Sequence, residues 1–474
     1  MPPLVSLPPA PRVTRTGGAA AAFPDPFGPD PSLEEALAKA SGLLASWFAG
    51  AATTSPLPGL SVLPAVAPQA EGLPSERLLA DLQRLMEGAY NPSHPGALAH
   101  LDPPPLVASL VGDLIAAGLN NNLLAEELSP SLTRLERSLC GWLAGQLGLP
   151  EGAGGVPASG GSLSNLMALV VARHSANYEG CANAVVLCSD DAHVSIGKAL
   201  RVMGLPPSAL RSLPVDEQGR LQVAALEEAL VQVQRQGLPV IAVVATAGTT
   251  VRGAVDPLEP MAALCRRHGV WLHVDGAIGA VYALAPAQAH RVAGLGLADS
   301  ITVNPQKLLG ITKTSSLLLL ARPALLASSF ATGLPYMEPG WSGAHGGESG
   351  LQGTRPAEIL KLWLGLRQLG LEGIAELLEG AIRRCAELEN LLAADGRLLL
   401  RGGMLHLLAF RPAELDGPGT QAWSERTRQA LLAERLMLSR PLYQGMHHLK
   451  AVLGNPHTRR QELECLARCV EASL

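Results

Sequence analysis

The sequence predicts an α/β protein built around a mostly parallel β-sheet. Between about residues 150 and 330, near-continuous apolar runs alternate with stretches of helical periodicity. Such runs are typical of strands buried on both faces, and their alternation with helices indicates a sheet covered by helices on both sides. The 474 residues are enough for two or three domains, and the 47% hydrophobic content excludes a wholly disordered chain.

Proline content separates the N-terminal segment from the rest. Residues 1–74 hold 14 of the 38 prolines, which predicts extended chain around one helix that begins near Ser32. A second amphipathic helix is predicted from about Ser75 to Gly88. The first of these helices has an apolar stripe that includes Trp47 and Phe48. Because such a helix cannot fold alone, we expect it to pack on the main body or on a partner chain.

The remaining elements follow in order along the chain. The predicted strands and helices of the sheet region cover 184–193, 221–236, 239–250, 258–269, 269–277 and 300–307. After about residue 356 the chain is rich in helical pattern, with strand-like pieces at 403–410 and 449–454. We therefore predict an N-terminal segment over 1–90, a large domain over 91–360 and a small C-terminal domain over 361–474.

Composition excludes several classes of function. The net charge of −5 disfavours nonspecific nucleic-acid binding, and no run of about 18 apolar residues is present to span a membrane. Seven cysteines without a CxxC pair argue against a secreted disulfide framework. Cys465 and Cys469 are better interpreted as a structural pair than as metal ligands. The sequence predicts a soluble, cytoplasmic protein without a metal site.

Polar residues at the ends of the predicted strands form the candidate site. Gly160, Gly161 and Ser162 precede a helix, an arrangement that suits a phosphate, although such a turn alone is a weak signal. Asp275 ends one strand, and Lys307 ends the next, where loss of solvation favours a neutral, nucleophilic amine. His193 follows a third strand, as a structural group or as a flat partner for an aromatic ligand.

These features together match the needs of pyridoxal 5′-phosphate (PLP). A lysine binds this cofactor as an imine, an aspartate keeps its ring nitrogen protonated, and an anion-binding turn holds its phosphate. An alternative is a metallohydrolase that uses His273 and Asp275 as an HxD pair, but the sequence offers no convincing third ligand.

Several ordered motifs resemble the group II PLP-dependent amino-acid decarboxylases. The markers run from about Asn91 to the C-terminus and include HPGALAHLDPPPLVASL, SGGSLSNL, DAHVSIGKAL, TAGTTVRGAVDP, WLHVDGAIGA, ADSITVNPQKLLG and GNPHT. The resemblance implies PLP fold type I, with a mostly parallel seven-stranded central sheet, a smaller C-terminal α+β domain and an N-terminal helical segment. It also implies a homodimer with shared active sites and no nucleic-acid or membrane partner.

The resemblance assigns roles residue by residue. Lys307 would carry the cofactor as a covalent aldimine, Asp275 would face the pyridine nitrogen, and His193 would stack on the ring. The other cofactor contacts would be Gly161, Ser162, Thr246, Ala277, Asn304 and Gln306. Tyr336, in a glycine-rich segment similar to the family's mobile loop, would return a proton to the substrate, and Arg355 would bind a substrate carboxylate or support the phosphate site.

The chain departs from the family pattern at a few positions. Gln306 stands where the family usually has His, and Gly276, Ile278 and Thr354 replace other common residues. An amide can donate to a phosphate but does not titrate near neutral pH. Because Gly276 and Ile278 replace a usual alanine and a usual aromatic residue, reduced apolar packing at the cofactor is expected.

The expected activity is decarboxylation of an L-amino acid to its amine and CO₂. The segment ALAHLDPPPLVASL is most similar to the 2,4-diaminobutyrate branch, whereas aspartate, cysteine sulfinate and glutamate stay open as substrates. Two alternatives remain: another fold-type-I lyase or aminotransferase, and a catalytically impaired protein of the same fold.

Overall fold

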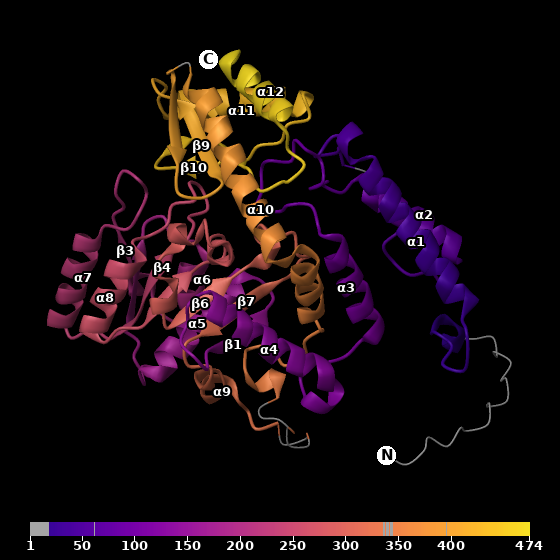
Figure 1. Ribbon diagram of the computed structural model, residues 1–474, viewed down its shortest axis with the longest axis horizontal. Helices are drawn as coiled ribbons and strands as arrows, with labels where there is room; N and C mark the ends of the chain where they lie inside the picture. The colour runs from indigo at the N-terminus through magenta and orange to yellow at the C-terminus, as the bar shows by residue number, and fades with distance from the viewer. Residues whose placement is uncertain (1–18, 61, 335–336, 338–340, 342–344, 395) are drawn as a thin grey trace. The chain divides into compact units, whose positions relative to one another are not determined.

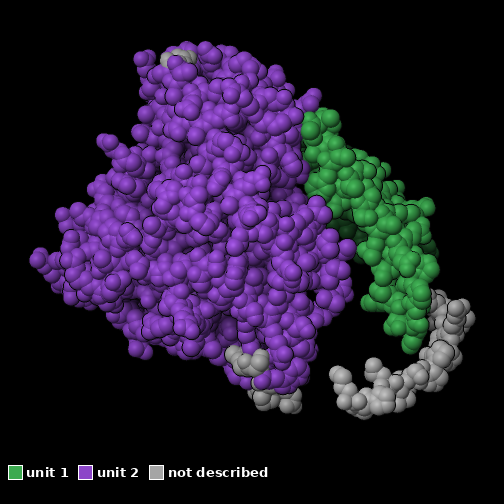
Figure 2. Space-filling model, viewed as in Figure 1, with its two compact units in different colours: residues 1–91 green, residues 92–474 purple. Residues whose placement is uncertain are grey.

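A computed structural model describes residues 19–60, 62–334, 337, 341, 345–394 and 396–474. The chain divides into two compact units, Met1–Asn91 and Pro92–Leu474, which are coloured separately in Figure 2. In the described ranges, no helix is both long enough and apolar enough to cross a membrane.

The N-terminal unit contains two helices, α1 (Pro31–Ala49) and α2 (Ser75–Glu87). Asp30 caps α1 by accepting hydrogen bonds from the backbone N–H groups of Ser32 and Leu33, as expected of an aspartate at this position. The Trp47 indole donates a hydrogen bond to the Met86 carbonyl over 3.2 Å and so links the two helices. None of the described residues of α1 or α2 is buried within the structure.

A seven-stranded sheet forms the centre of the second unit (Figure 1). Its strand order is β1-β7-β6-β5-β4-β2-β3, and β7 runs antiparallel to its two neighbours whereas the other pairs are parallel. The strands are β1 (Gly154–Ala158), β2 (Val185–Ser189), β3 (Leu210–Leu213), β4 (Val240–Thr246), β5 (Leu272–Asp275), β6 (Ser300–Val303) and β7 (Ser316–Leu320). The register places Asp275 between Thr246 and Thr302 at the carboxyl edge.

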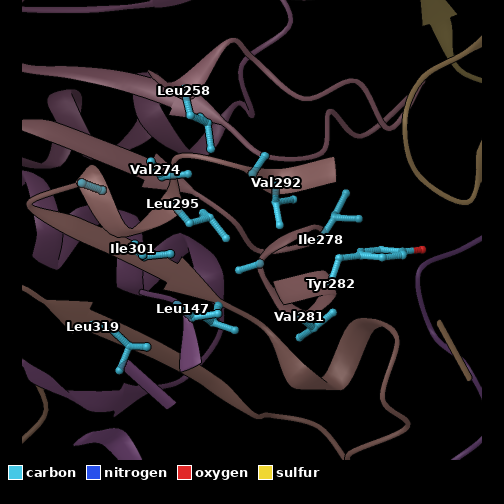
Figure 3. Close-up of a cluster of buried hydrophobic side chains, with 14 of the residues drawn as sticks. Leu147, Leu258, Val274, Ile278, Val281, Tyr282, Val292, Leu295, Ile301 and Leu319 are labelled. Carbon is cyan, nitrogen blue, oxygen red and sulfur yellow. The ribbon is translucent and has the colours of Figure 1, made fainter. Parts of the chain in front are cut away.

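Helices cover both faces of this sheet, as the apolar strands predict. One apolar cluster joins the sheet to α5 (Gly161–Ser175), α6 (Ser195–Val202) and α9 (Ala324–Phe330). The other, shown in part in Figure 3, involves α4 (Pro130–Gln146), α7 (Val223–Arg235), α8 (Leu258–His268) and α10 (Ile359–Ala393). Val243 and Val244 are successive residues of β4 that enter different clusters, because side chains alternate across a strand.

The smaller C-terminal domain has its own antiparallel sheet and apolar core. Its sheet has the strand order β12-β9-β8. Strands β10 and β11, which come between β9 and β12 in the sequence, form a separate two-stranded sheet. These elements are β8 (Leu398–Gly402), β9 (Leu407–Pro412), α11 (Gly417–Ala433), β10 (Leu442–Tyr443), β11 (Met446–His447), β12 (Leu449–Val452) and α12 (Arg460–Glu471). The predicted boundary at 360–361 falls inside α10, which changes direction at Gly370, where φ is +63°.

One element differs from its prediction in a way that affects the site. The run 300–307 is not a strand throughout: β6 ends at Val303, and residues Pro305–Lys307 form a 3₁₀ turn. Pro305 has no N–H to continue the ladder, and the Lys307 N–H donates to the Asn304 carbonyl over 3.0 Å. The lysine therefore lies on a turn beyond the strand end.

Candidate active site

A cleft of about 220 Å³ lies at the carboxyl edge of the central sheet. The structure brings into its lining nine residues that the sequence analysis proposed: Gly161, Ser162, His193, Thr246, Asp275, Ala277, Asn304, Gln306 and Lys307. Asn165, Gly248, Thr250 and Ile278 complete the lining. Carboxyl ends of parallel strands are where ligands bind in open α/β sheets, which explains the convergence.

One part of the cleft lining offers backbone N–H donors to an anion. Helix α5 begins at Gly161, so its first backbone N–H groups have no partner within the helix. A Cβ added at Gly161 would lie 2.9 Å from the Asn304 amide nitrogen, so a larger residue there would displace the Asn304 side chain. Asn304 is held in turn by Ser316, whose hydroxyl donates to Oδ1 over 2.7 Å.

Gln306 contributes to this part of the cleft lining through one side of its amide. Its Oε1 accepts a hydrogen bond from the backbone N–H of Ser315. Because the oxygen is engaged, the NH₂ group is the part of the amide available to a ligand. A donor rather than a titrating imidazole therefore occupies this position.

Asp275 is buried in the lining of the cleft, where two donors hold its carboxylate. The Asn165 amide donates to Oδ2 over 2.8 Å, and the Ala277 backbone N–H donates to Oδ1 over 3.2 Å. A buried carboxylate needs donors and a cation to offset lost hydration. The two donors are present, and a protonated ring nitrogen would be a suitable cation.

His273 does not behave as a metal ligand. Its Nδ1 lies 2.9 Å from the Ser300 hydroxyl and its Nε2 lies 3.0 Å from Oδ1 of Asn165, so both ring nitrogens are engaged within the protein. Burial lowers the pKa of His273 to about 4 and keeps the ring neutral at pH 7. No group of three or more possible metal ligands occurs among the described residues. The metallohydrolase alternative therefore has no support in this geometry.

The Lys307 amine is the nucleophilic candidate in the cleft. Burial lowers the pKa of Lys307, while the negative charges of Asp275 and Asp102 oppose the shift. Within the described part of the chain, no hydrogen bond or ion pair engages this amine. An unpaired buried amine with a lowered pKa is suited to attack a carbonyl carbon.

Two residues of the site were missed by sequence reasoning. Asn165 contacts Asp275 from α5, and its only signal was a position one helical turn after Ser162. Lys450 lies on β12 of the small domain, and its ammonium donates to the Thr250 carbonyl over 3.2 Å at the edge of the cleft. Burial and the positive charge of Lys307 lower the pKa of Lys450 to about 8. The signal for Lys450 was a single lysine inside an apolar strand.

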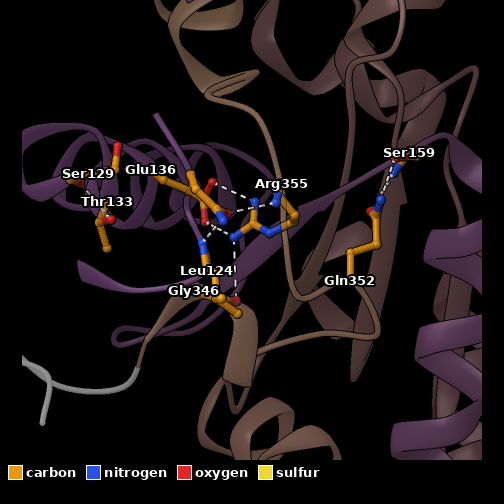
Figure 4. Close-up of polar contacts among 9 residues, drawn as sticks. Leu124, Ser129, Thr133, Glu136, Ser159, Gly346, Gln352 and Arg355 are labelled. Atoms are coloured by element: carbon orange, nitrogen blue, oxygen red, sulfur yellow. Dashed lines mark hydrogen bonds and ion pairs between the residues drawn. The ribbon is translucent and has the colours of Figure 1, made fainter. Parts of the chain in front are cut away.

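Arg355 does not line this cleft, and its assignment to substrate binding stays a prediction. The guanidinium forms two hydrogen bonds with Glu136, of 2.9 Å and 2.8 Å, and its Nη2 also lies 3.5 Å from the Gly346 carbonyl (Figure 4). Both side chains are buried, and neither lines the cleft. The terminal nitrogens are occupied by the protein itself. Tyr336 lies outside the described residues.

The lining fits pyridoxal phosphate on observations of the structure itself. Thr246 Oγ1 is buried and has no hydrogen-bond partner among the described residues, which is costly unless a ligand supplies one. Gly161 lets the start of α5 approach the Asn304 amide closely, and Lys307 and Asp275 lie in the same cleft. These residues would hold the phosphate, the ring and the reactive carbon of the cofactor.

Comparison with known proteins agrees with this chemistry. Residues 58–411 match the pyridoxal-dependent decarboxylase conserved domain. The chain is 33% identical over 394 residues to an L-2,4-diaminobutyrate decarboxylase of Rhizobium meliloti, covering 80% of this chain and 78% of that protein. It is 31% identical over 334 residues to an aromatic-L-amino-acid decarboxylase of Bacillus atrophaeus, covering 69% and 70%.

Solved structures show the same fold. The apo form of mouse CSAD matches with a TM-score of 0.86 at 24% identity, covering 94% of this chain and 99% of that one. The fold and the cleft thus define a PLP-dependent enzyme of fold type I. Within that class, the chain belongs to the pyridoxal-dependent decarboxylase family, and its decarboxylase relatives support a carboxy-lyase.

Proposed function

We propose that this protein decarboxylates a small, polar L-amino acid, with L-2,4-diaminobutyrate as the first substrate to test. The observation that carries the proposal is the lining of the cleft. Among its described lining residues, His193 has the only aromatic side chain, and most of the others are Gly, Ser, Thr, Ala or Asn. An aromatic substrate gains much of its affinity from apolar and aromatic walls, which this cleft offers sparingly. The R. meliloti relative supports the diaminobutyrate choice.

The cleft residues act on the cofactor and substrate as follows. Bound pyridoxal phosphate supplies an electron-withdrawing ring that stabilises negative charge at the α-carbon as CO₂ leaves. Lys307 would hold the cofactor through its amine. Asp275 would hold a proton on the ring nitrogen, and His193 would cover the ring. Tyr336 stays a prediction as the group that delivers a proton to the α-carbon.

Lys450 favours a second candidate, an acidic amino acid such as aspartate or cysteine sulfinate. Its ammonium lies at the edge of the cleft, close enough to Lys307 for that charge to lower the pKa of Lys450. A cation there attracts a carboxylate or sulfinate, whereas it repels the second ammonium of diaminobutyrate unless Lys450 pairs with the α-carboxylate. The two candidates therefore differ in which substrate group Lys450 meets.

We also propose a homodimer. The apolar helix α3 (Val107–Leu119) packs one face against α10, where Gly112 leaves no room for a Cβ beside Lys361. Its other face leaves Val107, Val111, Leu114 and Leu119 exposed. A second copy of the chain would remove this apolar surface from water. Sedimentation of the Leu114→Glu variant beside the parent protein tests this proposal. We expect the variant to lose the dimer, and a variant that sediments as the same dimer would contradict the proposal.

A substrate panel tests the proposed activity. CO₂ and amine formation should be measured for L-2,4-diaminobutyrate, L-aspartate, L-cysteine sulfinate, L-glutamate and L-tryptophan. We expect the highest kcat/KM for diaminobutyrate, with amine and CO₂ in equal amounts. A preference for tryptophan would contradict the argument from the lining, and a keto acid without CO₂ would contradict decarboxylation.

The pH dependence of KM tests Lys450 separately. Because the pKa of Lys450 is lowered to about 8, its ammonium should lose its proton as the pH rises through that value, and KM for an acidic substrate should then rise. Lys450→Arg keeps the charge and should flatten this rise. Lys198→Arg, on the exposed side of α6, is the matched control. The same KM curve for Lys450→Arg and the parent would remove Lys450 from substrate binding.

A further inference from the structure

Asn165 is the most fully connected polar side chain of the cleft. It is buried on α5, and its amide nitrogen donates to Oδ2 of Asp275 over 2.8 Å and to the Ser195 hydroxyl over 2.9 Å. Its Oδ1 accepts from the Thr302 hydroxyl over 2.8 Å and from Nε2 of His273 over 3.0 Å. All four hydrogen-bonding positions of the amide are used. Rotation by 180° would set its oxygen against the Asp275 carboxylate, so the network defines its orientation.

The same network defines which nitrogen of His193 carries a proton. Ser195 Oγ accepts from Asn165, so its own proton is free to point at Nδ1 of His193, which lies 2.8 Å away. The Ser195 backbone N–H also points at this nitrogen, over 3.2 Å. A nitrogen that faces two donors acts as an acceptor. The neutral imidazole therefore carries its hydrogen on Nε2, the ring nitrogen with no hydrogen-bond partner among the described residues.

The consequence is a link between the two groups assigned to the cofactor ring. Asp275 would face the ring nitrogen and His193 would cover the ring. The two residues come from different strand ends, and none of the hydrogen bonds of the described chain joins them. Asn165 contacts the first directly and reaches the second through Ser195. A single amide thus determines the orientation of both groups.

We infer that Asn165 is a positioning residue that, through Ser195, holds His193 as its Nε2–H tautomer while it orients the Asp275 carboxylate. The inference deepens the proposed decarboxylase function, and it rests on that function for the roles of His193 and Asp275. The hydrogen bonds themselves do not depend on the proposed function. Asn165 is not expected to touch the substrate, so its effects should pass through His193 and Asp275.

Ser195 variants separate the two branches of the network. Ser195→Ala removes the side-chain donor to His193 and leaves the Asn165–Asp275 hydrogen bond in place. In the parent, burial lowers the pKa of His193, the charge of Asp275 raises it and the charge of Lys307 lowers it. The hydrogen bond from Ser195 stabilises the neutral ring, so loss of this bond should raise the pKa of His193. Ser195→Thr retains a hydroxyl and should restore the parent behaviour. Thr302→Val, which removes a donor to Oδ1, is the matched control.

The first readout is the tautomer itself. Nitrogen NMR of the holoenzyme labelled in histidine distinguishes a protonated Nδ1 from a protonated Nε2. We expect the Nε2–H form of His193 in the parent, Ser195→Thr and Thr302→Val, and a mixture or a shifted titration in Ser195→Ala. A parent enzyme with its proton on Nδ1 overturns the inference. This measurement needs no turnover, so it stands even where the proposed substrate fails.

The second readout is the pH–rate profile. Ser195→Ala should move the acidic limb of kcat upward by about half a pH unit to one unit and lower kcat by about 10–100-fold, with KM little changed. Asn165→Leu should show the same loss and weaker binding of pyridoxal phosphate, because the Asp275 branch is broken too. A lowered melting temperature with an unshifted profile in both variants would reduce Asn165 to a packing residue and overturn the inference.

Discussion

The cleft and the Arg355–Glu136 pair are both buried and polar, but they are built in opposite ways. In the pair, the terminal nitrogens of Arg355 meet the two carboxylate oxygens of Glu136, so each charge is matched by the other. In the cleft, Lys307 has no hydrogen-bond partner in the described chain and Thr246 Oγ1 is likewise unpaired. The difference teaches that burial of charged residues does not mark a ligand site by itself. Unpaired groups mark it where they line a cavity, since Nε of Arg355 is also buried and unpaired among the described residues but does not face the cleft.

Breaking the pair should give the largest change in stability. Arg355→Met leaves Glu136 as a buried charge without its cation, and such a loss typically costs about 3–5 kcal/mol of unfolding free energy. Urea unfolding of the parent and the variant would measure it. The folded fraction should keep its cofactor spectrum, because Arg355 does not line the cleft.

The double variant Glu136→Leu/Arg355→Met sharpens the comparison. Replacing both partners by apolar residues of similar size removes the uncompensated charge and should recover most of the lost stability. If Arg355→Met instead unfolds normally but loses substrate affinity, the arginine acts on the substrate and its assignment to a structural pair is wrong.

Asp256 gives a smaller expected effect. It is a buried carboxylate with no ion pair among the residues that the structure describes. Its oxygens accept from the backbone N–H groups of Leu221 and Thr246, each over 2.7 Å, and so brace the end of β4 beside the cleft. Burial raises the pKa of Asp256 to about 6. Because the folded-state pKa lies above the unfolded value, the stabilisation is complete below about pH 4 and is lost as the pH rises through 6.

The measurable quantity is the difference between the parent and Asp256→Asn. A pKa raised from 3.8 to about 6 corresponds to about 3 kcal/mol of pH-dependent stability. The variant should lose this slope between pH 4 and 6, at a constant cost, since an asparagine offers one oxygen where the carboxylate offers two. Parallel stability curves for the two proteins over that range would show that Asp256 does not titrate there.

Sequence reasoning located the cleft because its residues stand at strand ends, and strand ends are visible as changes from apolar to polar residues. Lys307 and Asp275 were found in this way. It placed Lys307 on a strand, however, because the effect of Pro305 on the ladder was not taken into account. The resemblance assigned Arg355 to the substrate or the phosphate site, and its pairing with Glu136, 219 residues away in the chain, could not be predicted from the sequence. Asn165 and Lys450 were missed for the same reason.

Gly276 illustrates a departure with a structural cause. The sequence suggested that a glycine here reduces packing at the cofactor. In the structure Gly276 does not line the cleft, and a Cβ there would come within 2.7 Å of the Ala280 side chain and 3.0 Å of the Thr302 carbonyl. The glycine therefore permits close packing behind Asp275, a feature that only the fold reveals.

The most direct test of the central claim is to identify the lysine that holds the cofactor. The purified holoenzyme should be reduced with borohydride, digested and analysed by mass spectrometry. The account predicts the pyridoxyl group on Lys307, the unpaired amine of the cleft. Lys450 is a demanding internal comparison, since it is also buried, has a lowered pKa and lies at the edge of the same cleft. A pyridoxyl group on Lys450, or on any lysine other than Lys307, would contradict the account.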